Sequence, residues 1–219
     1  MATNKRPLSL GELRTYWQLI GSVPGLRGRC LRLHLLTGGQ RIEQLVRLRW
    51  ADVREDAITI YDAKGRPGQG PRTHTVPLLP AAARELHGVE RIGEFVFSTR
   101  KGVKAISGTT LSGWAGQVVG DAIDNFQLKR VRSGVETLLA ANRVSREIRG
   151  HLQSHGLTGV QARHYDGHDY MVEKRDALTI LSEAITAVSG EAGRRQSVRK
   201  AVRRMLNGAR NRVVVEGGH

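Results

Sequence analysis

The chain has 219 residues, and its 35 Lys and Arg outnumber its 20 Asp and Glu, which gives a formal net charge of +15 at pH 7. With a pI near 11.1, this excess favours a polyanionic partner, nucleic acid first, because Lys and Arg that neutralise phosphates release condensed counterions. The single cysteine, Cys30, excludes a disulfide or a cysteine-based zinc site within the chain. No apolar run approaches the roughly 20 residues of a membrane helix, and residues 1–8 lack the apolar segment of a signal peptide, so we expect a cytoplasmic protein with no membrane partner.

Helices are predicted throughout the first fifty residues. Ser9 and Glu12 have the spacing of a capping box. The apolar residues of this segment recur at helical spacing: Leu10, Leu13, Trp17 and Ile20. A second helix is expected over residues 26–36, where glycines 38 and 39 follow its end, and a short, largely buried third helix over residues 42–48.

The periodicity then changes to that of β structure. Residues 57–61 and 73–77 read as strands around a Gly- and Pro-rich turn at 64–71, which predicts a β-hairpin with a basic tip. Residues 95–97 are a candidate third strand. Between the predicted strands at 73–77 and 95–97, a helix is expected to begin at Pro80. Proline is tolerated in the first turn because its missing N–H would have no intrahelical partner there.

The remainder is predicted to be helical. Helices are expected over residues 110–123 and 132–141, after Ser145, and from Asp169 onward. The last of these has an apolar stripe that comprises Met171, Leu178, Leu181, Ile185 and Val188. Residues 189–193 are the best candidate linker, so we expect one domain at 1–188 and, at 189–219, the linker, a basic amphipathic helix and a C-terminal tail. These elements predict a mainly α fold with a small antiparallel β-sheet, of the α+β class.

Phosphoryl transfer needs groups that neutralise the phosphorane, an in-line nucleophile and an acid that protonates the leaving oxygen. The neutralising groups can be a metal ion or a cluster of Arg, Lys and His. The sequence has neither a carboxylate cluster of the kind that holds magnesium nor the glycine-lysine signature of a P-loop. That favours the metal-free solution, a cluster of Arg, Lys and His, and we expect no cofactor.

Several segments together resemble a known family. Residues 35–45 read LLTGGQRIEQL and are followed by LRWADV at 48–53, which resembles the first arginine box of the tyrosine recombinase (phage integrase) family. The second box, H-x-x-R, is similar to KRVR at 129–132, with lysine where histidine is usual. LQSHG at 152–156 resembles the L-G-H motif, and a tyrosine follows at Tyr165. The resemblance covers roughly residues 8–188 and is greatest to integrases of prophages and integrative elements of bacteria.

The resemblance implies the catalytic-domain fold of that family and a role for each matching residue. Tyr165 would attack the scissile phosphate and form a 3′-phosphotyrosine. Arg41 and Arg132 would bind the non-bridging oxygens of that phosphate. Planar guanidinium groups suit phosphate better than a point charge does.

Proton transfer is assigned in the same way. The family has a lysine on a β-hairpin turn between the two arginine boxes, and Lys64 lies where the strand pattern independently predicts that turn. Lys64 would protonate the leaving 5′-oxygen, and His155 would hydrogen-bond the phosphate, with Lys129 steadying charge and proton position.

Nearby residues offer alternatives. Arg66 or Arg72 could serve in place of Lys64, and Tyr170 is a rival nucleophile to Tyr165. Three histidines crowd the same region: His151, His164 and His168. Their irregular spacing and the absence of a nearby cysteine favour surface histidines over metal ligands.

Other residues are expected to have structural roles. Glu43 is interpreted as orienting Arg41 or capping its helix. Packing roles are expected for four aromatic residues: Tyr16, Trp50, Tyr61 and Trp114.

The expected partners are double-stranded DNA and further copies of the chain in a tetramer, in a bacterial, nucleoid-associated setting. The resemblance also implies an N-terminal core-binding domain, and none precedes Ser9, so the chain reads as an excised fragment or a natural short form. The basic helix at 194–206 has two possible roles, along DNA phosphates or against a neighbouring subunit together with residues 213–215; we favour the second. Two other functions stay open, a catalytically inactive DNA-binding or directionality protein and a type IB topoisomerase-like enzyme.

Overall fold

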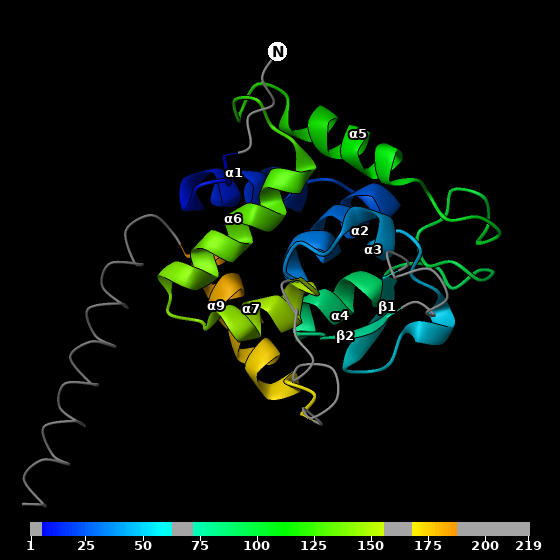
Figure 1. Cartoon of the computed structure of the whole chain (residues 1–219). Helices are drawn as coiled ribbons and strands as arrows, with labels where there is room; N and C mark the ends of the chain where they lie inside the picture. Colours follow the sequence, from blue (N-terminus) through cyan, green and yellow to red (C-terminus); the bar gives the residue numbers. More distant parts are fainter. Residues whose placement is uncertain (1–5, 63–71, 156–167, 188–219) are drawn as a thin grey trace, which may run out of the picture. The chain divides into compact units, whose positions relative to one another are not determined.

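The computed structural model describes residues 6–62, 72–155 and 168–187. Within them the helices are α1 (Leu10–Gly21), α2 (Gly25–Leu36), α3 (Ile42–Leu45), α4 (Pro80–His87), α5 (Gly108–Val119), α6 (Leu128–Ala141), α7 (Arg146–Gln153) and α9 (Met171–Thr186). A 3₁₀ turn covers Trp50–Asp52, and the strands are β1 (Ala57–Asp62) and β2 (Arg72–Pro77). The mainly α fold with a small antiparallel sheet is therefore confirmed (Figure 1).

The hairpin has the predicted strands. β1 and β2 pair antiparallel from Ala57 opposite Pro77 to Asp62 opposite Arg72. The third strand expected at 95–97 is wrong, because within the described residues the sheet has two strands and Phe95 makes only an isolated bridge to Arg49. Val96 and Phe97 are buried in the core. Burial accounts for the apolar residues here without any strand pairing.

Caps define several helix ends. The capping box at Ser9 and Glu12 is present, and Ser145 accepts a hydrogen bond from the Ile148 N–H at the start of α7. α5 ends at Gly120, whose φ is +50°, so the prediction that this helix reaches residue 123 is wrong. α6 begins at residue 128, before the predicted start, which places Lys129 on the helix.

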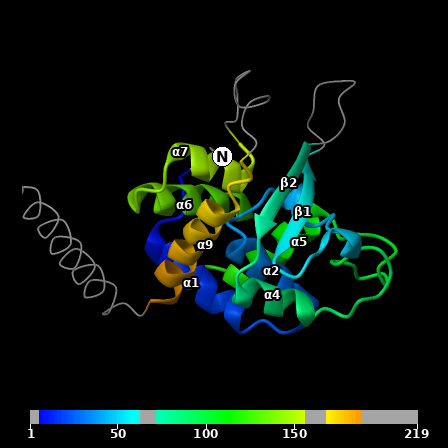
Figure 2. The same cartoon turned by 90° about the horizontal axis from the view of Figure 1, so that it is seen from below.

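Helix α2 lies near the middle of the fold. It buries side chains on all sides, as expected of a central helix, and the residues involved include Cys30, Leu31, Leu33 and Leu35. Figures 1 and 2 agree that α1, α6, α7 and α9 gather on one side of α2, with the hairpin on the other. The loop that leaves α2 contacts both groups, because Gly38 lies against Leu152 and Leu178 and Arg41 bonds Asp62 of β1.

The expected aromatic packing holds for three of the four residues. Tyr16 is fully buried, and Trp50 and Trp114 are partly buried against the core. Tyr61 was expected to pack, but 43% of it is exposed and its hydroxyl donates to Asp52 Oδ1 at 2.8 Å. Tyr61 points outward because alternate residues of a strand face opposite sides.

Contacts divide the chain into a compact unit, Met1–Ile185, and a second unit, Thr186–His219. Only residues 186 and 187 of the second unit are described. The predicted linker at 189–193, the basic helix at 194–206 and the apolar segment at 213–215 lie outside the described residues. Among the described helices, none has the length and apolar character to cross a membrane.

Candidate active site

The carboxyl end of α7, residues 152–155, is where side chains from distant parts of the chain meet. The last carbonyls of a helix have no intrahelical partner, and here side chains supply one. Leu152 O accepts from Gln40 Nε2 and from His74 Nε2, each at 2.9 Å. Gln153 O accepts from Arg132, and Ser154 O accepts from Arg41 Nη1 at 2.8 Å. We call residues 152–155 the α7 terminus.

Arg41 reaches the α7 terminus from the start of α3. Its Nη1 also donates to Asp62 Oδ2 at 2.8 Å, and Asp62 is the last residue of β1. Glu43, the acidic residue that the sequence suggested as its partner, is exposed, and its carboxylate lies against Gly108. The carboxylate that orients Arg41 is therefore that of Asp62.

Arg132 lies on α6 beside the loop that carries Arg41. Gly39 has a φ of +68°, and a Cβ built there would lie 2.8 Å from Arg132 Cα, so the close approach requires glycine. Arg132 Nη1 donates to Gly39 O at 3.2 Å. The pKa of Arg132 is lowered to about 10, mainly by burial and then by the charge of Arg41, while Glu136 and Asp62 oppose the change. The two guanidinium groups therefore lie close enough to repel each other, which favours binding of an anion between them.

His155 completes the α7 terminus. Ser154 adopts the left-handed conformation with φ 52°, which turns the chain after α7, and His155 N–H donates to Gly150 O at 3.0 Å. Its side chain is 34% exposed, with Nε2 3.2 Å from Gln153 Oε1 and 3.3 Å from Glu136 Oε2.

Lys129, Arg132 and Glu136 stand at helical spacing on α6 and therefore share one face of it. Lys129 is exposed there. Of the six predicted site residues, the structure brings Arg41, Arg132 and His155 together and places Lys129 on the same face of α6 as Arg132. Lys64 and Tyr165 lie outside the described residues.

Two further basic residues of the site were missed by the sequence analysis. His74 on β2 is buried; burial lowers its pKa to about 3, and the charges of Lys174, Arg132 and Arg41 act in the same direction. Lys174 on α9 is also buried, which lowers its pKa, and its Nζ donates to Thr75 O at 3.1 Å and to Asp169 O at 3.0 Å. Lys174 thus joins α9 to β2, beside the α7 terminus.

Tyr170, the rival nucleophile, is engaged elsewhere. Its hydroxyl donates to Glu147 Oε1 at 3.0 Å, and its ring stacks on His151 with 3.9 Å between centroids. His168 meets the same ring edge-on. Among the described residues no group of His, Cys, Asp and Glu could hold a metal ion, and His164 lies outside them.

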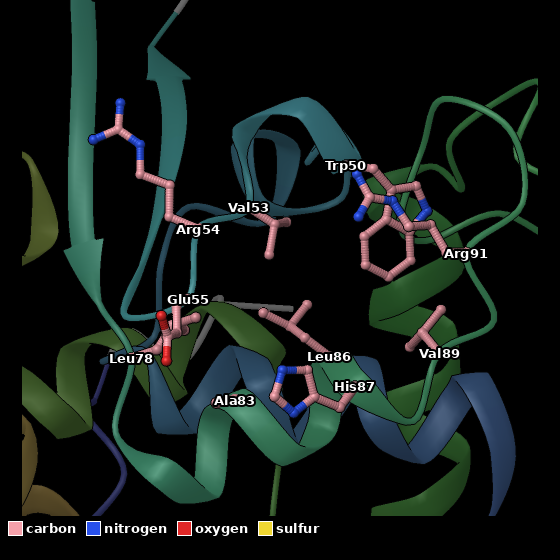
Figure 3. A pocket seen from close by; sticks show the side chains of 10 residues that line it. All are labelled: Trp50, Val53, Arg54, Glu55, Leu78, Ala83, Leu86, His87, Val89 and Arg91. Carbon is pink, nitrogen blue, oxygen red and sulfur yellow. The ribbon is translucent and has the colours of Figure 1, made fainter.

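A pocket of about 380 Å³ beside α4 is a separate feature (Figure 3). Arg91 lies over the ring of Trp50, with 5.5 Å from its Cζ to the centroid. A second hollow, of about 730 Å³, runs along α3 and β1. None of the basic residues at the α7 terminus lines either one, so the candidate site is separate from both hollows.

Comparison with known proteins identifies solved structures that have a similar fold. No protein-family model and no curated protein matches the chain. Among solved structures, the integrase from mycobacterium phage Brujita matches with a TM-score of 0.62 at 17% identity, over 87% of this chain and 63% of that one. The lambda integrase catalytic core matches with a TM-score of 0.52 at 20% identity, over 69% of this chain and 96% of that core. The chain has the fold of the tyrosine recombinase catalytic domain.

Longer structures with this fold are matched only in part. A lambda integrase (75–356) dimer bound to a COC′ core site matches with a TM-score of 0.51 at 22% identity, over 68% of this chain and 57% of that chain. The match therefore spans little more than half of that solved chain. At these identities the likeness is one of fold.

Proposed function

We propose that this chain is the catalytic part of a site-specific DNA recombinase, an integrase that cuts and rejoins duplex DNA through Tyr165. The observation that carries the proposal is the convergence of Arg41 and Arg132 on the α7 terminus, which ends at His155. On a chain with a net charge of +15, such a convergence suits a phosphate of nucleic acid.

Arg41 and Arg132 are assigned to the two non-bridging oxygens of the scissile phosphate. Hydrogen bonds to backbone carbonyls hold both guanidinium groups in place before any substrate binds. Groups held in advance toward developing charge stabilise a transition state without reorganising during the reaction. Burial lowers the pKa of Arg132 and the charge of Arg41 adds to that effect, and the repulsion between the two guanidinium groups is relieved when an anion binds.

The covalent step is a transesterification. The Tyr165 oxygen forms a bond to phosphorus as the bond from phosphorus to the 5′-oxygen breaks, and that oxygen takes up a proton, which we assign to Lys64. His155 hydrogen-bonds the phosphate, and Lys129 adds positive charge from the exposed face of α6. The phosphotyrosine conserves the bond energy, so attack by the 5′-hydroxyl of a partner strand rejoins the DNA without ATP or another high-energy cofactor. No step in this scheme uses a metal ion.

The partners are proposed from the same likeness. One solved lambda integrase structure with this fold is a tetramer bound to a Holliday junction, with a TM-score of 0.51 at 21% identity. We propose that this chain likewise acts on double-stranded DNA in a tetramer, during integration or excision of a bacterial mobile element. The nucleoid would then be its place of action.

A nicked suicide substrate tests the proposal. Duplexes that carry the end sequences of the encoding element, nicked near the candidate cleavage point, trap the phosphotyrosine because the cleaved oligonucleotide diffuses away. We expect an adduct that survives denaturation, its loss in Tyr165→Phe and its retention in the matched variant Tyr170→Phe.

Other outcomes identify other functions. Binding of the duplex without an adduct, from full-length protein on its own site, supports an inactive DNA-binding or directionality protein. Relaxation of any supercoiled plasmid without site preference supports a type IB topoisomerase-like enzyme. Loss of the adduct in Tyr170→Phe instead would overturn the assignment of Tyr165.

A further inference from the structure

The hydrogen-bond partners of His155 Nε2 identify where its ring hydrogen lies. Nε2 has two neighbours, Gln153 Oε1 at 3.2 Å and Glu136 Oε2 at 3.3 Å. The amide of Gln153 is oriented by its own NH₂ group, which donates to Gly38 O at 2.8 Å and to Arg132 O at 3.0 Å. Since both neighbours of Nε2 are acceptors, this nitrogen carries a hydrogen.

Glu136 is held from its other side by α7. Arg149 Nε donates to Glu136 Oε1 at 2.8 Å, and Arg149 also donates to Val144 O. The side chains of Arg149 and Glu136 are 15% and 27% exposed, so the pair is partly sheltered from water. One carboxylate oxygen is therefore committed to Arg149, and the other faces His155.

Glu136 also lies beside the arginine pair. It follows Arg132 by one turn of α6, and its charge raises the pKa of that guanidinium against the effect of burial. A carboxylate thus stands next to both Arg132 and His155, where the proposed function requires an anionic phosphate to bind.

We propose that Glu136 is a positioning residue that holds the Nε2–H of His155 toward the anion site in the DNA-free protein and yields that hydrogen bond to a phosphate oxygen when DNA binds. This inference rests on the proposed function. The exchange replaces N–H···carboxylate by N–H···phosphate, so the hydrogen stays on Nε2. Glu136 therefore has two opposite effects, because it orients the imidazole for reaction and repels the phosphate in the bound ground state.

The first test reads the tautomer of His155 directly, by ¹⁵N NMR of the imidazole nitrogens in the full chain at pH 8. In Glu136→Gln the amide oxygen accepts from Arg149, so the NH₂ group faces Nε2. Gln153 Oε1 is then the one acceptor left of the two neighbours of Nε2, and the tautomer population shifts toward Nδ1–H. We expect the Nε2–H pattern in the wild type, a larger Nδ1–H population in Glu136→Gln, and the wild-type pattern in the control Glu90→Gln, which alters an exposed carboxylate. Identical patterns in the wild type and Glu136→Gln would overturn the proposal.

The second test separates binding from reaction. With an uncleavable duplex at fixed salt, Glu136→Gln should bind about fivefold more tightly than the wild type, because a partly screened repulsion is removed. With the nicked substrate the same variant should form adduct about tenfold more slowly, because its imidazole is no longer oriented. Glu90→Gln should change neither quantity by as much. Binding that is unchanged or weaker in Glu136→Gln overturns the proposal.

The two hypotheses fail separately. If the wild type forms no adduct but the tautomer moves in Glu136→Gln and DNA binding tightens, the recombinase assignment fails and the positioning role of Glu136 stands. If the wild type forms the adduct and neither the tautomer nor the binding changes, the positioning role fails and the recombinase assignment stands.

Discussion

Arg130 and Arg132 stand two residues apart on α6 and serve two different regions. Arg130 is 1% exposed and donates to three backbone carbonyls and to Glu12 Oε1, all from the segments that cover the amino-terminal side of the helix. Arg132 points to the other side, where it donates to the carbonyls of Gly39 and Gln153 and faces a second guanidinium. The first arginine donates to a carboxylate. The second donates to carbonyls among the described residues and stands beside a like charge, with the carboxylate of Glu136 one turn along α6.

The difference separates a structural arginine from one available to a ligand. A guanidinium whose donors meet carbonyls and a carboxylate of the protein holds segments together. A guanidinium that donates to carbonyls and lies beside another cation can still bind an anion. Burial alone does not make this distinction, because both arginines are withdrawn from solvent.

The largest expected effect on the reaction comes from Arg132→Lys. An ammonium group cannot form two parallel hydrogen bonds to phosphate, so adduct formation should fall about 100-fold. The melting temperature should change little, since the lysine keeps its charge near the same carbonyls. Single-turnover cleavage of the nicked substrate and a thermal melt measure the two quantities, and a large loss of stability would show that Arg132 is structural.

Arg130→Met should lower the stability of the fold and leave the cleavage reaction unchanged. The substitution leaves Glu12 and three carbonyls without their donor in a buried place, so we expect a loss of about 3 kcal/mol in the free energy of unfolding. Urea unfolding measures it. Adduct formed per folded molecule, at low temperature, should match the wild type; a loss comparable to that of Arg132→Lys would break the comparison between the two regions.

Low pH should reduce the free energy of unfolding through two buried histidines near Arg132. Burial lowers the pKa of His34 to about 4 and that of His74 to about 3, against 6.5 for an ordinary imidazole. Below pH 6.5 the unfolded chain binds protons that the folded chain does not, so stability is complete above that pH and falls as pH drops toward 4 and then 3. At pH 5 each histidine should cost on the order of 2 kcal/mol.

Urea unfolding at pH 7 and pH 5 checks this sign and size. His74→Gln should remove roughly half of the difference between the two pH values. The exposed His87 offers a matched variant, His87→Gln, that should leave the difference unchanged. A stability that rises on acidification would contradict the burial of both imidazoles as neutral groups.

The smallest effect is expected at the helix cap of the Arg130 region. Ser9 Oγ accepts from Glu12 N–H at 3.2 Å, and Glu12 in turn accepts from Arg130. Ser9→Ala should cost about 1 kcal/mol in the free energy of unfolding. Because Glu12 joins the cap to Arg130, the double variant with Arg130→Met should lose less than the two single losses combined, and strict additivity would show that the two contacts are independent.

Local patterns were sufficient for most of the elements. The capping box at Ser9, the cap at Ser145 and the alternation of the hairpin depend on neighbours in the chain, so they could be predicted from short windows. The errors have a tertiary cause. Residues 95–97 are apolar because the core surrounds them, and Tyr61 faces solvent because the opposite face of β1 is the one that packs.

The sequence by itself predicted Arg41, Arg132 and His155 as residues of the candidate site, because they lie in segments that resemble the motifs of a known family. Only the tertiary structure decided what surrounds them. Asp62, Glu136, His74 and Lys174 meet the site through contacts between residues far apart in sequence, such as Arg41 with Ser154, 113 positions away. Pairings at such distances depend on how the helices and the hairpin pack, and no local pattern specifies them, so the charge balance at the α7 terminus could be known only from the folded chain.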